Sequence, residues 1–480
     1  MKNVNHRIFR GYDLRGLVDE DLSEELALNL GKAFGSYLQQ RGISEAVVGR
    51  DSRASGPAYS KALIEGLSWA GIDVIDIGMV LIGTFYWSQY FFNRRGGVYV
   101  SASHNPPNYN GFKFANDFSE TLVTAGMQEM LQRVTDDDYQ KGTQPGKIEK
   151  KDIKQAYFQR ALEGITIDTS LKVVVDPSCS TAGAFAPDLL RQVGVEVIEY
   201  NTNVDSSFPL GTADPTETHV INRLSKEVVE SGADVGFTFD ADGDRIGIVD
   251  ENGEPIWNDK LVAIFACDVL AEHPGATIMY NLYCSKAVKQ TIEARGGVPY
   301  QWRVGHSFLK KKNQEVKAAF IGELSGHFFF SKDFYNHDDG LYSMLRVLQY
   351  ISRSKKKLSE LAAEIPEYVS SPEIKIGVDD DKKVAVVEML AARLKEENPG
   401  ALVIDDERAG DGLRIEMGDA MFVIRYSQNG PYCGMKFEAK SRDEYEKLRQ
   451  YILKTLKSIP EFDFDAAISG NTEALEVALV

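Results

Sequence analysis

Polar side chains suited to chemistry gather in four short loops, each of which follows an apolar, strand-like stretch. The first loop, SASHNPPNYNGFK at 101–113, contains Ser103, His104 and Lys113. A serine on a rigid turn at a strand end is well placed to act as a nucleophile or phosphate carrier, and Lys113 is a candidate phosphate contact or proton shuttle. An ordinary turn would also explain the Asn, Pro and Gly residues. A Ser103–His104 dyad is disfavoured, because adjacent side chains seldom face each other.

The second loop, DADGDR, places Asp240, Asp242 and Asp244 at alternate positions. Three carboxylates this close repel one another unless a cation lies between them. Hard oxygen ligands on a short loop favour Mg²⁺, with a phosphate oxygen as a further ligand. Arg245 then balances charge or orients the phosphate. A solvated acidic turn is disfavoured, because apolar strands flank the loop on both sides.

Two other interpretations fit the aspartate loop less well. An EF-hand needs glycine where this chain has Arg245, and its flanks must be helices, whereas here they are strand-like. A phosphatase of the haloacid-dehalogenase type would use Asp240 as nucleophile and Asp242 as acid. That motif has Thr or Val where this chain has Asp244, and it leaves the serine loop unexplained.

The third loop, GELSGH, carries Glu323, Ser325 and His327 at alternate positions. If the backbone is extended, all three side chains point the same way, and a carboxylate with a hydroxyl suits sugar hydroxyls. A polar strand end is the plain alternative. His306, in RVGHS, ends the preceding strand and is either an acid/base group of the same cleft or a structural histidine.

The fourth loop, RYSQNGP, begins at Arg425 and includes Ser427 and Asn429. An arginine and a hydroxyl beside the backbone N–H groups of a turn can clamp a phosphate. Hairpin turns often have this composition, so the loop by itself is a weak signal.

A strand–helix–strand pattern followed by a third strand recurs three times and positions the first three loops. The expected strands lie at 46–53, 70–78 and 96–107, at 171–178, 193–201 and 233–244, and at 275–283, 295–305 and 318–327. This spacing is typical of right-handed βαβ crossovers. Since ligands bind outside the carboxyl ends of such strands, three repeats offer three loops to one cleft.

The pattern predicts an α/β protein of four domains, three repeated mixed α/β units and a smaller α+β domain with helices at 382–396 and 442–456. We predict domains at 1–147 with the serine loop, 148–252 with the metal loop, 253–367 with the sugar loop and 368–460 with the phosphate loop, then an acidic tail at 461–480. A length of 480 residues agrees with several domains. We expect the tail to pack as an extra helix.

Composition excludes some partners. A net charge of −17 disfavours a nucleic-acid surface, and no apolar run is long enough for a membrane span. Four scattered cysteines and no signal peptide indicate no disulfide framework, no zinc site and a reducing cytoplasm. An acidic protein that binds phosphates must focus a few basic groups, and a metal, into one cleft.

These motifs, in this order and spacing, resemble the α-D-phosphohexomutases. FRGYDLRG at 9–16 resembles that family's N-terminal arginine segment, and RYSQNGP occupies the position of its phosphate-binding loop. The resemblance extends from about residue 8 to 458. GELSGH is most similar to GEMSGH of the phosphomannomutase/phosphoglucomutase branch.

The resemblance implies a Mg²⁺-dependent isomerase that interconverts hexose 1-phosphate and hexose 6-phosphate, of mannose or glucose, through a hexose 1,6-bisphosphate. It implies a heart-shaped four-domain arrangement and a monomer or homodimer. Implied roles are catalysis for Ser103, Lys113, His306 and Arg15; metal binding for Asp240, Asp242, Asp244 and the Ser103 phosphate; and substrate binding for Arg10, His104, Arg245, Glu323, Ser325, His327, Arg425, Ser427 and Asn429.

Two alternatives stay open beside the mutase. One is a sugar phosphatase, in which water replaces the second sugar hydroxyl. The other is a degenerate mutase that senses sugar phosphates without turnover. It is favoured only by the fourth loop, where the family has RxSNTEP and this chain has Asn429 and Gly430 in place of Thr and Glu.

Overall fold

A computed structural model of the protein describes residues 4–428 and 430–478 and divides into two compact units. The first unit comprises 1–258, 310–320 and 325–362, and the second comprises 259–309, 321–324 and 363–480. The third repeat is therefore shared between both units. Among the described residues, no helix combines the length and the apolarity needed to cross a membrane.

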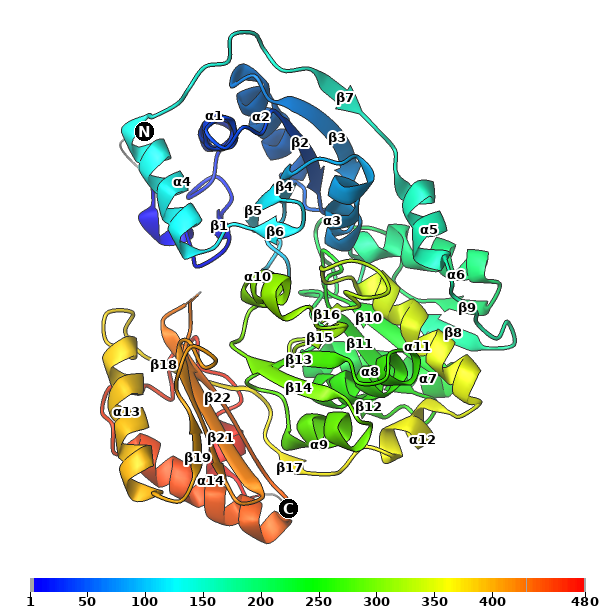
Figure 1. Ribbon diagram of the computed structural model, residues 1–480, viewed down its shortest axis with the longest axis vertical. Helices are drawn as coiled ribbons and strands as arrows, with labels where there is room; N and C mark the ends of the chain where they lie inside the picture. The colour runs from blue at the N-terminus through cyan, green and yellow to red at the C-terminus, as the bar shows by residue number, and fades with distance from the viewer. Residues whose placement is uncertain (1–3, 429, 479–480) are drawn as a thin grey trace. The chain divides into compact units, whose positions relative to one another are not determined.

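The first repeat forms a mixed sheet in the order β1-β5-β4-β2-β3-β7, with β6 beside β5 (Figure 1). Strand β2 pairs in parallel with both β3 and β4, and β5 runs antiparallel to β4. The parallel pairs follow from the predicted crossovers. The strands are β1 (Leu14–Leu17), β2 (Glu45–Arg50), β3 (Asp73–Met79), β4 (Gly96–Val100), β5 (Tyr109–Asp117), β6 (Glu120–Thr121) and β7 (Ile148–Lys150).

The helices of the first repeat include a close pair, α1 (Glu24–Gln39) and α2 (Gly56–Trp69), which lie side by side (Figure 1). Ser23 caps α1 by accepting a hydrogen bond from the Leu26 N–H. The chain also forms η1 (His6–Ile8), α3 (Ile82–Phe91) and α4 (Thr124–Asp136). Leu30, Phe34 and Leu63 belong to the buried core between these helices and the sheet.

The second repeat has the same strand order, since β11-β10-β8-β9 corresponds to β5-β4-β2-β3. In each of the two sheets the four strands pair in parallel except for the last one, β5 or β11, which runs antiparallel to its neighbour β4 or β10. The elements are α5 (Lys154–Leu162), β8 (Lys172–Val175), η2 (Thr181–Ala184), α6 (Ala186–Val193), β9 (Glu196–Glu199), α7 (Thr218–Ser231), β10 (Val235–Phe239), β11 (Ile246–Asp250) and β12 (Pro255–Ile256).

The third repeat begins with the same parallel crossover, because β13 pairs in parallel with β14. Its elements are α8 (Asn258–Glu272), β13 (Thr277–Asn281), α9 (Lys286–Ala294), β14 (Val298–Trp302), α10 (His306–Val316), β15 (Phe320–Gly322), β16 (Phe328–Phe329), α11 (Gly340–Ser354) and α12 (Leu358–Ala363). The repeated α/β architecture predicted from the sequence is confirmed.

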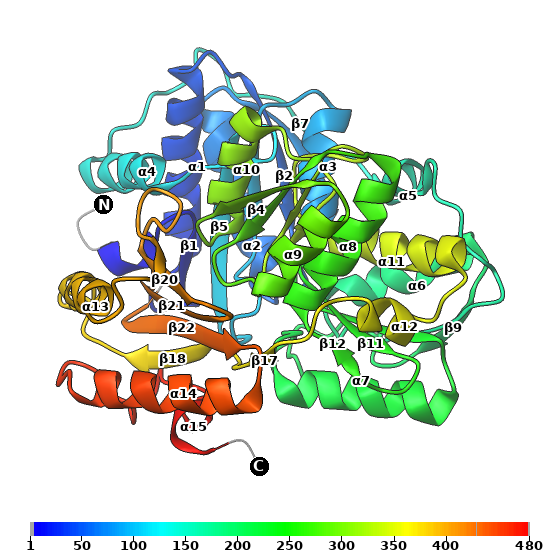
Figure 2. The same ribbon diagram turned by 60° about the horizontal axis from the view of Figure 1, so that its bottom comes forward.

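The C-terminal domain is an α+β structure in which α13 (Lys383–Glu397) and α14 (Arg442–Lys457) pack against an antiparallel sheet (Figure 2). The sheet order is β17-β22-β21-β20-β19, with β18 beside β22. Its strands are β17 (Val369–Ser370), β18 (Ile374–Gly377), β19 (Leu402–Ile404), β20 (Gly412–Met417), β21 (Ala420–Tyr426) and β22 (Tyr432–Ala439).

The C-terminal tail packs on this domain. Asp463 and Gly470 form β-bridges with β18, and Leu475 of the short helix α15 (Glu473–Glu476) is fully buried in the domain core. The tail therefore packs along one edge of the C-terminal sheet, and the only helix in its described residues is the four-residue α15.

Candidate active site

The serine loop holds Ser103 in a left-handed conformation with φ 50°, and the side chain is 3% exposed. Its N–H donates to Ser101 Oγ at 2.8 Å, and its Oγ donates to Asp240 Oδ2 at 2.9 Å. Ser103 Oγ also lies 3.1 Å from His104 Nδ1. Contrary to the expectation from sequence, the adjacent Ser103 and His104 side chains do face each other, because the left-handed turn brings them together.

The aspartate loop is a tight turn between β10 and β11. Asp240 Oδ1 accepts hydrogen bonds from the N–H groups of Gly243 at 3.0 Å and Arg245 at 3.2 Å. Gly243 adopts φ 74°, which glycine adopts without strain. This turn brings one oxygen each of Asp240, Asp242 and Asp244 to within 4.8 Å of one another, with all three residues buried.

The aspartate set fits a divalent cation. Asp242 Oδ1 is buried and makes no hydrogen bond, although a buried polar oxygen normally has a partner. Burial raises the pKa of Asp240, and the charges of Asp244 and Asp242 raise it further. A hard cation would satisfy the free oxygen and offset this repulsion.

Lys113 supplies one positive charge to the aspartate set. Its Nζ donates to Asp242 Oδ2 and to Asp244 Oδ2, both at 3.1 Å. Burial lowers the pKa of Lys113, but the two carboxylates outweigh burial and hold it well above its ordinary value. Lys113 is therefore a charged group in this arrangement.

Arg245 supplies a second positive charge. Its Nε lies 3.3 Å from Asp240 Oδ2, and its Nη1 lies 3.3 Å from Asp214 Oδ1. Burial disfavours ionised Asp214, yet Arg245 and His104 together lower the pKa of Asp214 to about 2. The remaining Nη2 atom of Arg245 is buried without a hydrogen-bond partner, so this guanidinium retains a free donor.

The N-terminal arginine segment reaches the serine loop through Arg15. Its Nε donates to Asp13 Oδ2 at 2.8 Å, and its Nη1 donates to Asn105 Oδ1 at 2.9 Å. Arg10 is half-buried, and its backbone N–H donates to the Asp13 carbonyl. Arg15, a residue of β1, thus contacts the turn that carries Ser103 through Asn105.

The GELSGH segment is not extended, so the condition under which its three side chains would point the same way is not met. Residues 324–326 form a turn in which Gly326 has φ 93°. His327 forms a β-bridge with Arg245, and its Nε2 lies 3.5 Å from Asp244 Oδ1. Ser325 Oγ lies 2.8 Å from His327 Nδ1. His327 therefore connects Ser325 to the aspartate loop.

Glu323 and His306 lie in the second compact unit. Glu323 Oε2 accepts hydrogen bonds from Asn281 Nδ2 at 3.0 Å and from the Gly305 N–H at 2.9 Å. His306 begins α10 and is buried. The Glu323 carboxylate is therefore held by Asn281, at the end of β13, and by Gly305, the residue before His306.

The fourth loop begins with a bidentate ion pair. Arg425 donates to both oxygens of Asp411, at 3.1 Å and 2.7 Å, and Asp411 is buried. The N–H of Ser427 donates to the Tyr432 carbonyl at 2.9 Å, which closes the hairpin. Asn429 lies outside the described residues.

Three family models match most of the chain. Their descriptions are phosphoglucomutase/phosphomannomutase α/β/α domain I at residues 6–141, domain II at 155–253 and domain III at 257–368. The chain belongs to this family, the α-D-phosphohexomutases. The predicted family and enzyme class, a phosphohexomutase, are confirmed.

Similar proteins agree over nearly the full length of this phosphohexomutase. A phosphomannomutase/phosphoglucomutase of Pseudomonas aeruginosa is 36% identical over 454 residues, covering 94% of this chain and 96% of the relative. A phosphoglucomutase of Neisseria gonorrhoeae is 32% identical, covering 96% and 99%. The crystal structure of a family protein from Burkholderia thailandensis has a TM-score of 0.88 at 33% identity, covering 95% and 98%.

Some residues that shape this phosphohexomutase site were missed from the sequence. Ser101 Oγ donates to Asp242 Oδ2 at 3.0 Å and accepts from the Ser103 N–H, so it joins the serine loop to the aspartate loop. Asp214 and Asp411 are the carboxylates that hold Arg245 and Arg425. No local pattern marks these roles, because Asp242 is 141 residues from Ser101 and the two arginines are 31 and 14 residues from Asp214 and Asp411.

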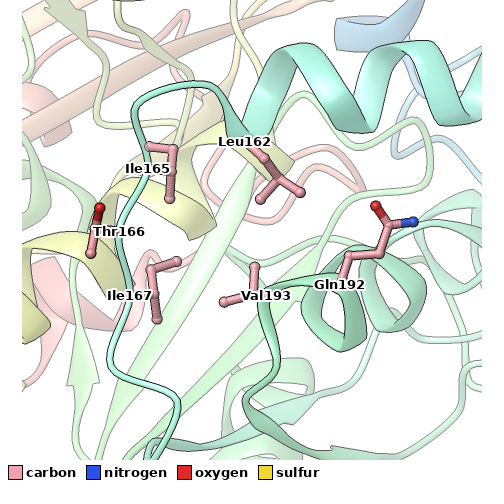
Figure 3. Close-up of a pocket in the computed structure, with 6 residues that line it drawn as sticks. All are labelled: Leu162, Ile165, Thr166, Ile167, Gln192 and Val193. Atoms are coloured by element: carbon pink, nitrogen blue, oxygen red, sulfur yellow. The ribbon is translucent and has the colours of Figure 1, made fainter.

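One surface pocket of about 310 Å³ contains none of the predicted site residues (Figure 3). It lies between the segment after α5 and the end of α6, and it is lined by Leu162, Ile165, Thr166, Ile167, Gln192 and Val193. Its lining offers no ionisable group, so it does not compete with the aspartate and serine loops as a site for phosphoryl chemistry.

Proposed function

We propose that this phosphohexomutase interconverts the 1-phosphate and 6-phosphate of glucose, mannose or both, with Ser103 as the phosphoryl carrier and Mg²⁺ bound by the three aspartates. One observation carries the proposal: Ser103 Oγ donates to Asp240 Oδ2 at 2.9 Å, directly beside a buried, metal-competent carboxylate set. The names of the two relatives, phosphomannomutase/phosphoglucomutase and phosphoglucomutase, support the choice of sugars.

Mg²⁺ held by Asp240, Asp242 and Asp244 would offset the charge of the transferring phosphoryl group. A phosphoserine carries about −1.5 to −2 charges at neutral pH. Lys113, Arg15 and Arg245 add positive charge around the same serine and aspartate loops. Phosphoryl transfer depends mainly on positioning and charge stabilisation of this kind.

In the first half-reaction, a sugar hydroxyl oxygen attacks the phosphorus and the bond between phosphorus and Ser103 Oγ breaks. The hydroxyl proton must leave, and the Ser103 oxygen must be neutralised. Lys113 is held protonated by Asp242 and Asp244, so it suits charge neutralisation or proton donation. We assign the proton-accepting role to His306, because an imidazole nitrogen can act as a general base.

In the second half-reaction, the bisphosphorylated sugar has reoriented and its other phosphate is transferred back to Ser103. Glu323 and Ser325 are proposed to bind the sugar hydroxyls in both orientations. Arg425 and Ser427 are proposed to hold the phosphate that is not reacting. The Arg425–Asp411 pair fixes the guanidinium for this purpose.

The deciding experiment combines intact mass measurement with Ser103→Ala. The purified protein is expected to carry one phosphate on Ser103, at least in part, and Ser103→Ala is expected to fold normally and lose nearly all mutase activity. Ser60→Ala is a matched control, because the Ser60 hydroxyl donates only to the nearby Pro57 carbonyl. Full activity of Ser103→Ala would end the phosphoserine mechanism.

Product analysis separates the mutase from the other two functions. With hexose 1-phosphate and a trace of the 1,6-bisphosphate, a mutase yields hexose 6-phosphate and releases little inorganic phosphate. A phosphatase releases one inorganic phosphate per turnover. A degenerate sensor binds the sugar phosphate and yields neither product.

A further inference from the structure

Arg53, just beyond the end of β2, is a fully buried arginine that the predicted chemistry does not use. It is 1% exposed, and each of its guanidinium nitrogens is bonded. Nε donates to Asp51 Oδ2 at 3.1 Å. Nη1 donates to the carbonyls of Pro106 at 2.6 Å and Tyr109 at 2.8 Å. Nη2 donates to the carbonyls of Ser103 and Asn105, both at 2.6 Å.

These five hydrogen bonds use all five N–H donors of the guanidinium. Four of them end on the backbone of one short turn, from Ser103 to Tyr109. The loop is short of its own donors, because Pro106 and Pro107 have no N–H. Buried carbonyls without donors are costly, so Arg53 supplies what the loop backbone lacks.

The bonded turn includes the strained residue of the site. Ser103 has φ 50°, a left-handed conformation that is sterically unfavourable for a residue other than glycine. Such a conformation persists only where surrounding contacts over-determine it. The carbonyl of Ser103 is held by Arg53 and its N–H by Ser101. Both sides of the strained residue are therefore fixed.

We propose that Arg53 is a positioning residue for phosphoryl transfer, because its four bonds to the 103–109 turn hold Ser103 in the conformation that places Oγ beside Asp240. The inference rests on the proposed role of Ser103 as phosphoryl carrier. Asp51 anchors Arg53 in turn, since its Oδ1 accepts from the Arg53 N–H at 3.0 Å and its Oδ2 accepts from Nε. The ring of Phe208 lies 5.3 Å from the guanidinium.

Lysine cannot replace arginine in this role. A lysine keeps the positive charge but offers three donors on a single nitrogen, whereas the guanidinium fork spreads five donors in one plane. Arg53→Lys therefore separates geometry from charge. Arg50→Lys is the matched control, because Arg50 is the last residue of β2 and its Nη1 donates to one carbonyl, that of Asp51.

The test compares wild type, Arg53→Lys and Arg50→Lys. Arg53→Lys is expected to lower kcat on the order of tenfold to a hundredfold, as misplacement of a reacting group does, with KM unchanged. Transfer of phosphate from glucose 1,6-bisphosphate to dephosphorylated Ser103, followed by intact mass, should slow equally. Amide hydrogen exchange should rise in 103–110 and stay at wild-type rates in β2, β3 and β4. Arg50→Lys should match wild type.

Either of two results overturns the inference. One is a wild-type kcat with wild-type exchange in the 103–110 turn. The other is faster exchange across the whole first sheet, which would mean general destabilisation. If Arg53→Lys does not fold, Asp51→Asn serves as the second test, because it weakens the hydrogen bond that Asp51 accepts from Arg53 Nε. Asp51→Asn should lower kcat by less than Arg53→Lys, with KM unchanged. An unaltered kcat contradicts the inference.

Ser103→Ala keeps this test independent of the proposed function. If Ser103→Ala is fully active, the phosphoserine mechanism fails whatever Arg53 does. If Ser103→Ala is inactive, wild type carries the phosphate and Arg53→Lys behaves as wild type, only the positioning role fails.

Discussion

Asp242 shows how much of the chemistry is decided by single atoms. One of its oxygens accepts hydrogen bonds from Ser101 and Lys113, and the other is buried without a hydrogen-bond partner. A bonded oxygen fixes the orientation of the carboxylate, and a free oxygen can bind a cation. The same division of labour holds for Arg245, whose Nε and Nη1 are paired with carboxylates while Nη2 is free.

The first prediction concerns the metal. Chelation is expected to abolish turnover and Mg²⁺ to restore it, and Asp242→Asn should lower both the rate and the affinity for Mg²⁺ in a titration of activity and of bound metal. The reason is loss of a charged hard ligand. Asp250→Asn is the control, because its carboxylate accepts only backbone N–H groups after β11. Turnover after exhaustive chelation would contradict the prediction.

The second prediction concerns Arg425. Arg425→Ala is expected to cost about 2–4 kcal/mol in kcat/KM, as loss of a charged partner in a binding site does. Arg408→Ala is the matched control, because Arg408 forms a similar bidentate pair with Asp406 but is exposed. Replacing Asn429 by Thr and Gly430 by Glu should change KM by less than Arg425→Ala does. A silent Arg425→Ala would favour the degenerate-sensor function.

At the scale of secondary-structure elements, the helices α1 and α2 approach each other so closely that only glycine fits at two positions. In the pair α1 and α2, a Cβ added at Gly66 would lie 2.1 Å from the Leu28 carbonyl oxygen, and one at Gly31 would lie 2.2 Å from the Leu63 carbonyl oxygen. The two glycines thus let the helix backbones touch. Both helices belong to the buried core of the first sheet, whose strand β4 leads into the serine loop.

The third prediction follows from this helix pair. Gly66→Ala is expected to destabilise the fold by about 1–3 kcal/mol through overpacking, although alanine favours a helix by roughly 1 kcal/mol over glycine. Thermal unfolding followed by circular dichroism should show a lower midpoint. Gly400→Ala is the control, since a Cβ there meets nothing within 4 Å. An unchanged midpoint for Gly66→Ala would mean that the helices can separate at no cost.

The fourth prediction concerns the start of α11. Asp339 caps this helix by accepting from the Tyr342 N–H at 3.0 Å, and it accepts from the Tyr157 hydroxyl at 2.7 Å. Burial raises the pKa of Asp339 to about 7, and the charge of Asp338 adds to this. The folded state therefore holds this proton more tightly than the unfolded state, so its contribution to stability is complete below about pH 4 and declines as pH rises toward 7.

The measurement is the unfolding midpoint of wild type and Asp339→Asn between pH 4 and 8. The wild type should lose up to about 1.4 kcal/mol per pH unit relative to the variant, so the variant should gain relative stability as pH rises. Asp465→Asn, on the exposed tail, should run parallel to wild type. Parallel curves for Asp339→Asn would show that this carboxyl is ionised in the fold.

At the scale of the whole molecule, one strand order is used repeatedly and each copy contributes a different loop. The first copy carries Ser103 and the second carries the three aspartates, both in the first compact unit. Glu323, His306 and Arg425 belong to the second unit. The residues proposed to bind the sugar and the distal phosphate therefore lie between Glu323 and Ser427, in the second half of the chain.

The fifth prediction concerns substrate choice. If Glu323 and Ser325 bind the 3- and 4-hydroxyls, which glucose and mannose share, both hexose 1-phosphates should be turned over. Comparing kcat/KM for the two sugars, with a trace of the matching bisphosphate, checks this. Discrimination beyond roughly a hundredfold, about 2.7 kcal/mol, would show that another group contacts the hydroxyl at C2.

The sequence by itself determined the repeated α/β architecture and the loops that carry Ser103 and the three aspartates. Both rest on local patterns, since strand periodicity, turn residues and motif spacing act between near neighbours in the chain. The sequence also indicated Lys113 and Arg245, which stand beside these motifs. The approach of His104 to Ser103 and the turn in GELSGH could not be predicted from local patterns, because a left-handed serine and a glycine turn redirect side chains that an extended backbone would hold apart or align.

Only the tertiary structure decided which distant residues hold the loops in place. Arg53 bonds to a turn about 50 residues away, and Asp214 pairs with Arg245 across a separation of 31 residues. Ser101 and Asp242 are 141 residues apart. A buried charge must find partners wherever the fold brings them, and this requirement leaves no periodic or local trace in the sequence.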